Sequence, residues 1–197
     1  MTLYNADISA GSLMLPESRR IARLMLTNPD RAAWIDAIER NNILQKKSPA
    51  TARRQGRLVR KRLETLDAAA WRMLSEGDQE VAVQIVLAAA IKHSRLLADF
   101  MRVVVADHLR RMENALSPAD WDAFLADCGQ RDPSVTGWSA TTSAKLLQVV
   151  LRILAEAGYV ESTRCLRLTP PLVHPDVRRY LQGHAEAAVL AAMELKQ

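Results

Sequence analysis

SPATARRQGRLVRKRLETL, residues 48–66, sets the architecture of the first third of the chain. It begins as helices do. Ser48 can cap the free amides of a first turn, and Pro49 suits the first helical position because its missing N–H would be unpaired there. Between Lys46 and Leu63 there are eight Lys or Arg and no Asp or Glu. Since like charges four residues apart destabilise a helix, this composition predicts a partner outside the chain that relieves the repulsion.

A helical wheel at about 100° per residue divides this stretch into an apolar face and a basic one. The narrow apolar face holds Ala52, Gly56, Val59, Leu63 and Leu66. The opposite face holds Arg54, Arg57 and Lys61, with Arg53 and Arg60 on one flank and Gln55 and Arg62 on the other. The pattern predicts a helix that packs on a core and shows a basic stripe to the outside, with Gly56 closely packed against a neighbour.

Two shorter helices are predicted before the basic one. Pro16–Leu26 has apolar residues at helical spacing, and Asn28-Pro29-Asp30 ends it and caps a second helix over about Asp30–Asn41. A helix-turn-helix unit has this order of elements: a helix, a short loop, a second helix, another loop and a long basic helix.

The rest of the chain divides into a scaffold and a second module. Residues 67–133 are predicted as several packed helices, with residues 76–78 as a turn and Ser117-Pro118 starting another helix. After them, a helix capped by Thr141, Thr142 or Ser143 and stopped at Gly158 precedes two short strands, 158–162 and 165–169, and a final helix over Val177–Lys196. This order is typical of a winged helix.

We therefore expect an all-α protein with helix-turn-helix or winged-helix-like parts at both ends and one short β-hairpin wing near the C-terminus. The expected divisions are 1–66, 67–133 and 134–197, forming one compact unit. Seven Gly and eight Pro in 197 residues agree with a mainly helical chain, and 49% apolar residues permit a real core.

Charge is unevenly distributed along the chain, whose net charge is +5. Residues 1–66 hold 13 basic and 6 acidic residues, residues 67–133 hold 7 and 11, and residues 134–197 hold 7 and 5. A basic front suggests a polyanion such as DNA, because Lys and Arg neutralise phosphates and release counterions. The front candidates for DNA binding are Lys46, Lys47, Thr51, Arg53, Arg54, Arg57, Arg60 and Lys61. The alternatives are a merely solvated helix, or one whose charge is neutralised by the acidic middle.

The C-terminal part offers a second, thinner set of candidates for DNA contact. They are Lys145, Gln148 and Arg152 on its helix and Arg164 and Arg167 on the expected wing. Since winged helices also serve as protein-contact modules, this surface has two interpretations.

No signature of catalysis or of a cofactor is present. The four His and two Cys have no metal-ligand spacing, and no phosphate-binding, dinucleotide-binding or nucleophile-elbow motif occurs. We predict no catalytic residue, no metal and no cofactor. The absence of a signal-peptide pattern and of a long apolar run predicts a soluble, cytoplasmic protein without a membrane partner.

Four stretches resemble the BrxA family of the bacterial BREX (bacteriophage exclusion) defence system. They are YNADISAGSLMLPESRRIARLML (4–26), NNILQKKSPATARRQGRLVRKRLETL (41–66), AVQIVLAAAIKHSRLLADFMRVVVADHLR (82–110) and LRILAEAGYVESTRCLRLTPPLVHPDVRRYL (151–181). The resemblance implies a small non-enzymatic DNA-binding protein, all-helical with winged-helix-like ends, acting beside the methyltransferase and ATPases of that system. It carries no catalytic residue over.

The resulting hypothesis is a double-stranded DNA-binding accessory protein of phage defence, held mainly by phosphate contacts and with weak sequence preference. An alternative is an adapter whose basic helix docks on an acidic protein. RNA binding is a weaker alternative, because exposed aromatic side chains for stacking on unpaired bases are not evident.

Overall fold

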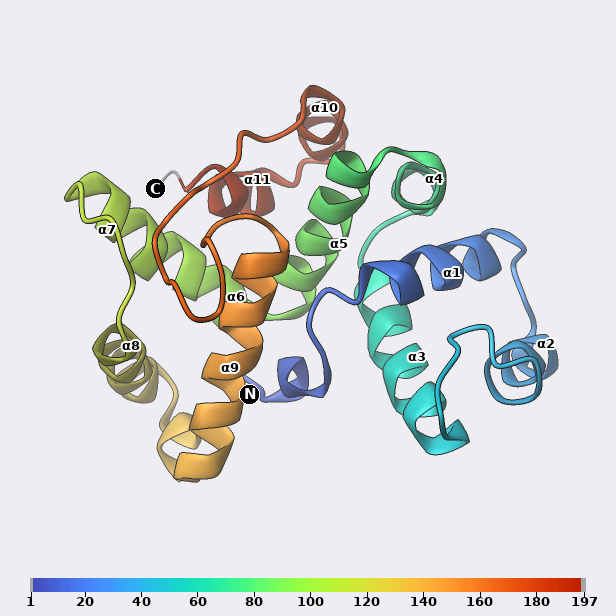
Figure 1. The fold of residues 1–197 in the computed structure, drawn as a ribbon, viewed down its shortest axis with the longest axis horizontal. Coiled ribbons are helices and arrows are strands. Elements are labelled where there is room, and N and C mark those ends of the chain that lie inside the picture. The colour runs from blue at the N-terminus through green and yellow to red at the C-terminus, as the bar shows by residue number, and fades with distance from the viewer. Residues whose placement is uncertain (1, 196–197) are drawn as a thin grey trace.

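The computed structural model describes residues 2–195, and the regular elements of this part of the chain are all helical (Figure 1). The elements of the first half are the 3₁₀ turn η1 (Asp7–Ala10), α1 (Leu15–Leu26), α2 (Arg31–Ile35), the π turn η2 (Asp36–Arg40), α3 (Pro49–Leu63), α4 (Ala68–Glu76) and α5 (Gln79–His93). Those of the second half are α6 (Arg95–Asp99), the π turn η3 (Phe100–Val105), α7 (Ala106–Arg110), α8 (Pro118–Arg131), the 3₁₀ turn η4 (Pro133–Gly137), α9 (Ala140–Glu156), α10 (Pro175–Gly183) and α11 (Ala187–Glu194). The predicted all-α class is confirmed.

α5 is the central element of the packing. Ten of its residues are buried, including the continuous run Gln84–Ile91, so the helix is apolar on all sides rather than along one stripe. It contacts α1, α3, α4, α6, α10 and α11. In Figure 1, α1–α4 lie on one side of α5 and α6–α8 on the other, with α9 between the two groups. The scaffold predicted for the middle of the chain is therefore helical, and its first long helix is the core.

At the front of the chain, α2 and α3 begin at the capping residues that the sequence predicts. The Asp30 carboxylate accepts from the Ala33 amide at 2.7 Å, and the Ser48 hydroxyl accepts from the Thr51 amide at 3.3 Å. Both contacts satisfy amides that have no partner inside the helix. The predicted sequence of three helices at the front is thereby confirmed, with α2 continuing directly into η2.

The N-terminal segment is tied to distant parts of the fold. The amides of Leu3 and Tyr4 donate to the Asp132 carboxylate at 2.6 and 3.0 Å, and the Tyr4 hydroxyl donates to Asp99 at 2.8 Å. The hydrogen bond from the Tyr4 amide, followed by those from Ser134 and the Leu3 amide, lowers the pKa of Asp132 to about 2. The hydrogen bonds of Leu3 and Tyr4 fix the start of the chain, and with it η1, beside α3 and α9.

The predicted β-hairpin wing is wrong. Residues 2–195 contain no β-strand, and the segments 158–162 and 165–169 meet in a single isolated bridge, Val160 with Leu168. A second isolated bridge joins Ala115 to Arg167, so the other edge of this segment pairs with the connection before α8. Pro170 and Pro171 follow at once and have no N–H to donate, so the pairing ends there after the Thr169 amide donates to the Tyr159 carbonyl. At the other end, the Ser162 amide donates to the Cys165 carbonyl and closes a turn.

Two further boundaries differ from the sequence-based expectation. The cap of α9 is Ser139, whose hydroxyl accepts from the Thr142 amide at 3.1 Å, so the helix begins before the predicted capping residues. The predicted final helix is two helices, α10 and α11, separated at 184–186. Ala185 there has a φ of 56°, a left-handed conformation that no helix interior contains.

No single helix in residues 2–195 is long and apolar enough to cross a bilayer, although Gln79–His93 and Arg95–Arg110, bent by 108°, together pass that test of length and composition.

Candidate nucleic-acid interface

α3 presents its basic stripe because its opposite face is fully committed to the core. Ala52, Gly56, Val59 and Leu63 are all buried, as the wheel predicts. A Cβ on Gly56 would lie 3.4 Å from the Ile38 side chain, which confirms close packing against η2. Arg54, Arg57 and Lys61 are exposed on the other side. They are spaced by three and four residues, so they follow one line of about 10 Å along the helix.

These three cations have no partner inside the described chain. The side chains of Arg54, Arg57 and Lys61 make no hydrogen bond and no ion pair with any of residues 2–195. Arg57 and Lys61 are four positions apart and Arg54 and Arg57 are three positions apart, so their charges repel one another across single helical turns. Within the described residues, no ion pair relieves this repulsion.

Three of the other predicted cations of the front, Lys46, Arg53 and Arg60, are engaged by nearby acids. Arg53 pairs with Glu39 at 3.0 Å. Arg60 pairs with Glu64 at 2.7 Å and lies over the Trp34 ring at 4.4 Å. Lys46 pairs with Glu17, and both side chains are largely covered. Lys47 is exposed, and the Thr51 hydroxyl accepts from Ser48 at 2.9 Å. Exposed pairs of this kind contribute about 0–1 kcal/mol, so Arg53 and Arg60 can exchange partners at small cost.

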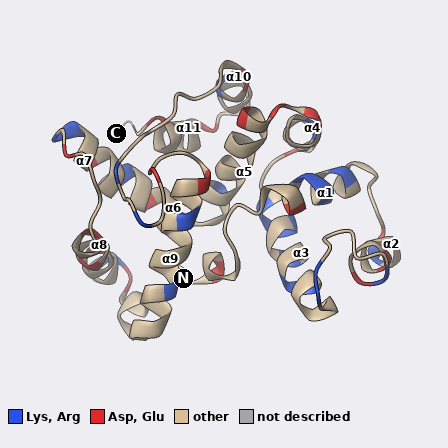
Figure 2. Ribbon diagram, viewed as in Figure 1, with Lys and Arg blue, Asp and Glu red and all other residues tan. Residues whose placement is uncertain are grey.

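The acidic middle of the chain does not neutralise α3. Glu17, Glu39 and Glu64 all belong to residues 1–66, and within the described chain no ion pair joins a cation of α3 to residues 67–133. Figure 2 shows the Lys and Arg positions, in blue, along α3 and α1 on one side of the molecule. One alternative for the basic helix was neutralisation by the acidic middle of the chain. No ion pair between α3 and residues 67–133 supports it among the described residues.

Arg62 is a structural residue that the wheel did not identify. It is 2% exposed, and its guanidinium donates to the carbonyl oxygens of Gly11, at 2.8 Å, and Ser12. The Glu156 carboxylate in turn accepts from the Ser12 hydroxyl and the Leu13 amide, both at 2.8 Å. Burial lowers the pKa of Arg62 to about 10, against an opposing effect of the Glu156 charge, so the side chain stays charged at neutral pH.

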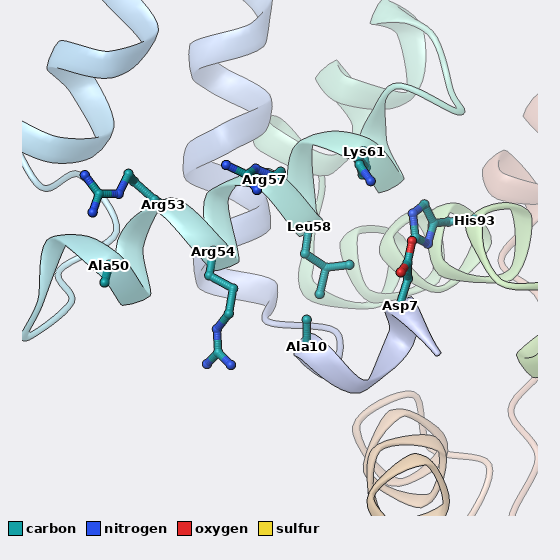
Figure 3. Close-up of a pocket in the computed structure, with 9 residues that line it drawn as sticks. All are labelled: Asp7, Ala10, Ala50, Arg53, Arg54, Arg57, Leu58, Lys61 and His93. Carbon is teal, nitrogen blue, oxygen red and sulfur yellow. The ribbon is translucent and has the colours of Figure 1, made fainter. Parts of the chain in front are cut away.

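A pocket of about 310 Å³ opens beside the basic stripe, between η1, α3 and the end of α5 (Figure 3). Its lining consists of Asp7, Ala10, Ala50, Arg53, Arg54, Arg57, Leu58, Lys61 and His93. Four of these residues are cations of α3 and one is acidic. No sequence pattern pointed to Asp7 or His93 here, because neither lies near the basic helix along the chain.

The predicted C-terminal candidates form a separate group. Lys145, Gln148 and Arg152 are exposed on one face of α9, at spacings of three and four residues. Arg164 is exposed, whereas Arg167 pairs with Glu161 at 2.7 Å. None of the five lines the pocket beside α3. Of the winged helix expected at the C-terminal end, the described residues therefore contain the helix, α9, but not the β-hairpin wing.

The described residues hold no group of three or more His, Cys, Asp or Glu placed to bind a metal ion. Cys128 is buried and Cys165 exposed, and both are free thiols.

Comparison with known proteins gives one consistent result. The family model BrxA matches residues 2–185. A protein of Paramagnetospirillum magneticum (strain ATCC 700264 / AMB-1), named BREX protein BrxA, is 43% identical over 98% of this chain and 96% of its own length. One of the same name from Escherichia coli O9:H4 (strain HS) is 35% identical over 97% and 90%. The crystal structure of an uncharacterised protein from Magnetospirillum magneticum has a TM-score of 0.90 at 41% identity, covering 98% of this chain and 99% of that one.

Proposed function

Since this chain belongs to the BrxA family of BREX phage-defence systems, we propose that it is a non-catalytic protein that binds double-stranded DNA in that defence. The observation that carries the proposal is the line of three unpaired cations, Arg54, Arg57 and Lys61, on the outer face of α3. Other proteins of the same system, such as its methyltransferase and ATPases, are its proposed partners.

Duplex DNA fits this stripe in charge and in spacing. A line of about 10 Å along a helix corresponds to the rise of about three base pairs, and each strand carries one phosphate per 3.4 Å of that rise. Arg54 and Arg57 can each grip a phosphate with two N–H donors, and Lys61 adds a point charge. A fourth contact comes from Lys47, which is exposed in the loop before α3.

The binding we propose is mainly to the DNA backbone. Phosphate contacts position a protein on a duplex but carry no direct sequence information. The exposed residues of the stripe include no Asn or Gln, the side chains that hydrogen-bond to adenine edges. The stripe therefore has no adenine-specific contact to accompany an arginine that pairs with guanine. We therefore expect weak sequence preference and strong salt dependence.

The proposal is tested by fluorescence anisotropy of a labelled 30-base-pair duplex titrated with the protein at several salt concentrations. Three to four phosphate contacts predict that the logarithm of the association constant falls against the logarithm of salt with a slope of about −3 to −4. A second duplex of scrambled sequence is expected to bind within about threefold of the first. The single strands are the matched comparison and are expected to bind with a shallower slope.

Absence of duplex binding at about 50 mM salt would contradict DNA binding by the isolated protein. The alternative would then be an adapter whose basic helix docks on an acidic surface of another BREX protein. A pull-down against the other components, repeated with α3 variants, would identify that surface.

A further inference from the structure

The pocket beside α3 combines an apolar base with a cationic rim. Figure 3 shows Leu58 of α3 and Ala10 of η1 pointing toward one another, with Arg54 on one side and Lys61 and His93 on the other. Leu58 is buried, whereas Arg54, Arg57 and Lys61 are exposed and unpaired within residues 2–195. A hollow with cations on its rim attracts an anion more strongly than a neutral surface does.

His93 adds a titratable ring to this pocket. It is the last residue of α5, it is half-buried, and its buried Nδ1 has no hydrogen-bond partner in the described part of the chain. Burial is the main cause that lowers the pKa of His93, and the charges of Arg62 and Lys61 lower it further, while Asp7 acts in the opposite direction. The ring is therefore mostly neutral at pH 7.

Asp7 is the single carboxylate among the lining residues. Its amide donates to the Asn5 side chain, but its own carboxylate makes no ion pair or hydrogen bond with residues 2–195, although cations line the same pocket. An unpaired negative charge here weakens the attraction of the pocket for any anion. Its position on η1 is fixed, because the preceding Tyr4 is anchored to Asp99 and Asp132.

We propose that this pocket, whose rim includes Arg54, Arg57 and Lys61, seats one phosphate group, that the phosphate comes from the DNA backbone, and that Asp7 holds the affinity of this contact down. The inference rests on the proposed function, since it assigns a place to one of the phosphates that the basic stripe contacts. It adds two residues, Asp7 and His93, that lie outside the basic helix.

A seated phosphate also makes binding depend on pH. Its negative charge favours the protonated form of His93, so the pKa of His93 rises on binding and the complex takes up a proton. Binding then strengthens as the pH falls from 7.5 to 6.0. The charges that act on the ring are Arg62 and Lys61 from α3 and Asp7 from η1; on its own helix, Lys92 is paired with Glu186.

The decisive experiment compares duplex affinity of wild type, Asp7→Asn and Asp122→Asn by anisotropy at low salt. Asp122 is exposed on α8, so its substitution makes the same change in net charge on another element. We expect Asp7→Asn to bind about threefold to tenfold more tightly and Asp122→Asn to remain within about twofold of wild type, because screening limits charge effects to about 10 Å. A gain in affinity cannot arise from misfolding.

Equal effects of the two substitutions would overturn the phosphate seat while leaving duplex binding by α3 intact. A His93→Gln variant tests the predicted pH dependence. Between pH 7.5 and 6.0, the duplex affinity of wild type is expected to rise by about threefold more than that of this variant. Equal pH dependence of the two proteins would overturn the part assigned to His93.

Free phosphate is distinguished from DNA by a thermal-unfolding titration with inorganic pyrophosphate. Suppose wild type binds no duplex, so that the proposed function fails. A rise in melting temperature with pyrophosphate that is larger for Asp7→Asn than for wild type would then show that the pocket takes a free phosphate compound instead of DNA. No rise in either protein would overturn the pocket as an anion site as well.

Discussion

Changing Arg54, Arg57 and Lys61 together to glutamate is expected to weaken duplex binding by more than about 100-fold at low salt while the fold is retained. The substitution removes three phosphate contacts and replaces them with charges that repel the backbone. Because the three side chains are exposed and have no partner within residues 2–195, no contact of the folded state is lost. Anisotropy measures the affinity, and circular dichroism with urea unfolding verifies the fold.

The matched control reverses three cations of the C-terminal group, Lys145→Glu, Arg152→Glu and Arg164→Glu. It makes the same change in net charge on exposed residues of another surface. We expect it to weaken binding by less than about tenfold, through long-range charge alone. A larger loss from the C-terminal variant than from the α3 variant would contradict α3 as the main contact and move the interface to α9.

Replacing Arg62 with alanine is expected to lower the free energy of unfolding by about 3–5 kcal/mol. The substitution leaves the carbonyls of Gly11 and Ser12 without their charged donor and opens a cavity beside α3. Urea unfolding followed by circular dichroism gives the difference, provided the transition is two-state. Lysine is not expected to restore stability, because one ammonium does not reproduce the fork that serves two carbonyls.

Arg57→Ala, on the same helix, is the control for this prediction. Arg57 is exposed and unpaired among the described residues, so its loss is expected to change stability by less than about 0.5 kcal/mol. The two substitutions therefore separate the two roles that we propose for α3, in which Arg62 holds the fold and Arg57 contacts DNA. A cost below about 1 kcal/mol for Arg62→Ala would show that the link between α3 and the N-terminal segment is weak.

Local patterns predicted the front of the fold well. The caps Asp30 and Ser48 and the spacing of buried residues from Ala52 to Leu63 are properties of neighbouring residues, so α1, α2 and α3 and the outward direction of Arg54, Arg57 and Lys61 follow from the sequence. Burial of Arg62 depends instead on the loop at Gly11 and Ser12, about 50 residues earlier in the chain. A wheel contains no information on such a contact, so it placed Arg62 on a flank.

The end of the chain was predicted less well, for a related reason. Alternation over 165–169 is typical of a strand, but in the fold Leu168 donates to the carbonyl of Asn114, and Leu116 donates to that of Leu166. Those partners lie some 50 residues away along the chain, and no local pattern identifies them. The break between α10 and α11 did have a signal, since Gly183 precedes it.

The cations of the candidate site could be predicted from the sequence, but which of them are paired with acids could not. Glu17 and Glu39 neutralise Lys46 and Arg53 through contacts that only the packing of α1 and η2 on α3 creates. The same holds for the pocket, whose Asp7 and His93 come from two other elements.

The most direct test of DNA binding by α3 is chemical footprinting of lysines with an acetylating reagent, read by mass spectrometry, with and without saturating duplex. Lys61 lies on the outer face of α3, whereas Lys92 is paired with Glu186 and serves as the internal reference. We expect the duplex to lower the reactivity of Lys61 at least about fivefold, through direct cover and charge pairing with phosphate, and to leave that of Lys92 unchanged. An unchanged Lys61 at saturation, above all with Lys145 protected, would contradict α3 as the surface that holds DNA.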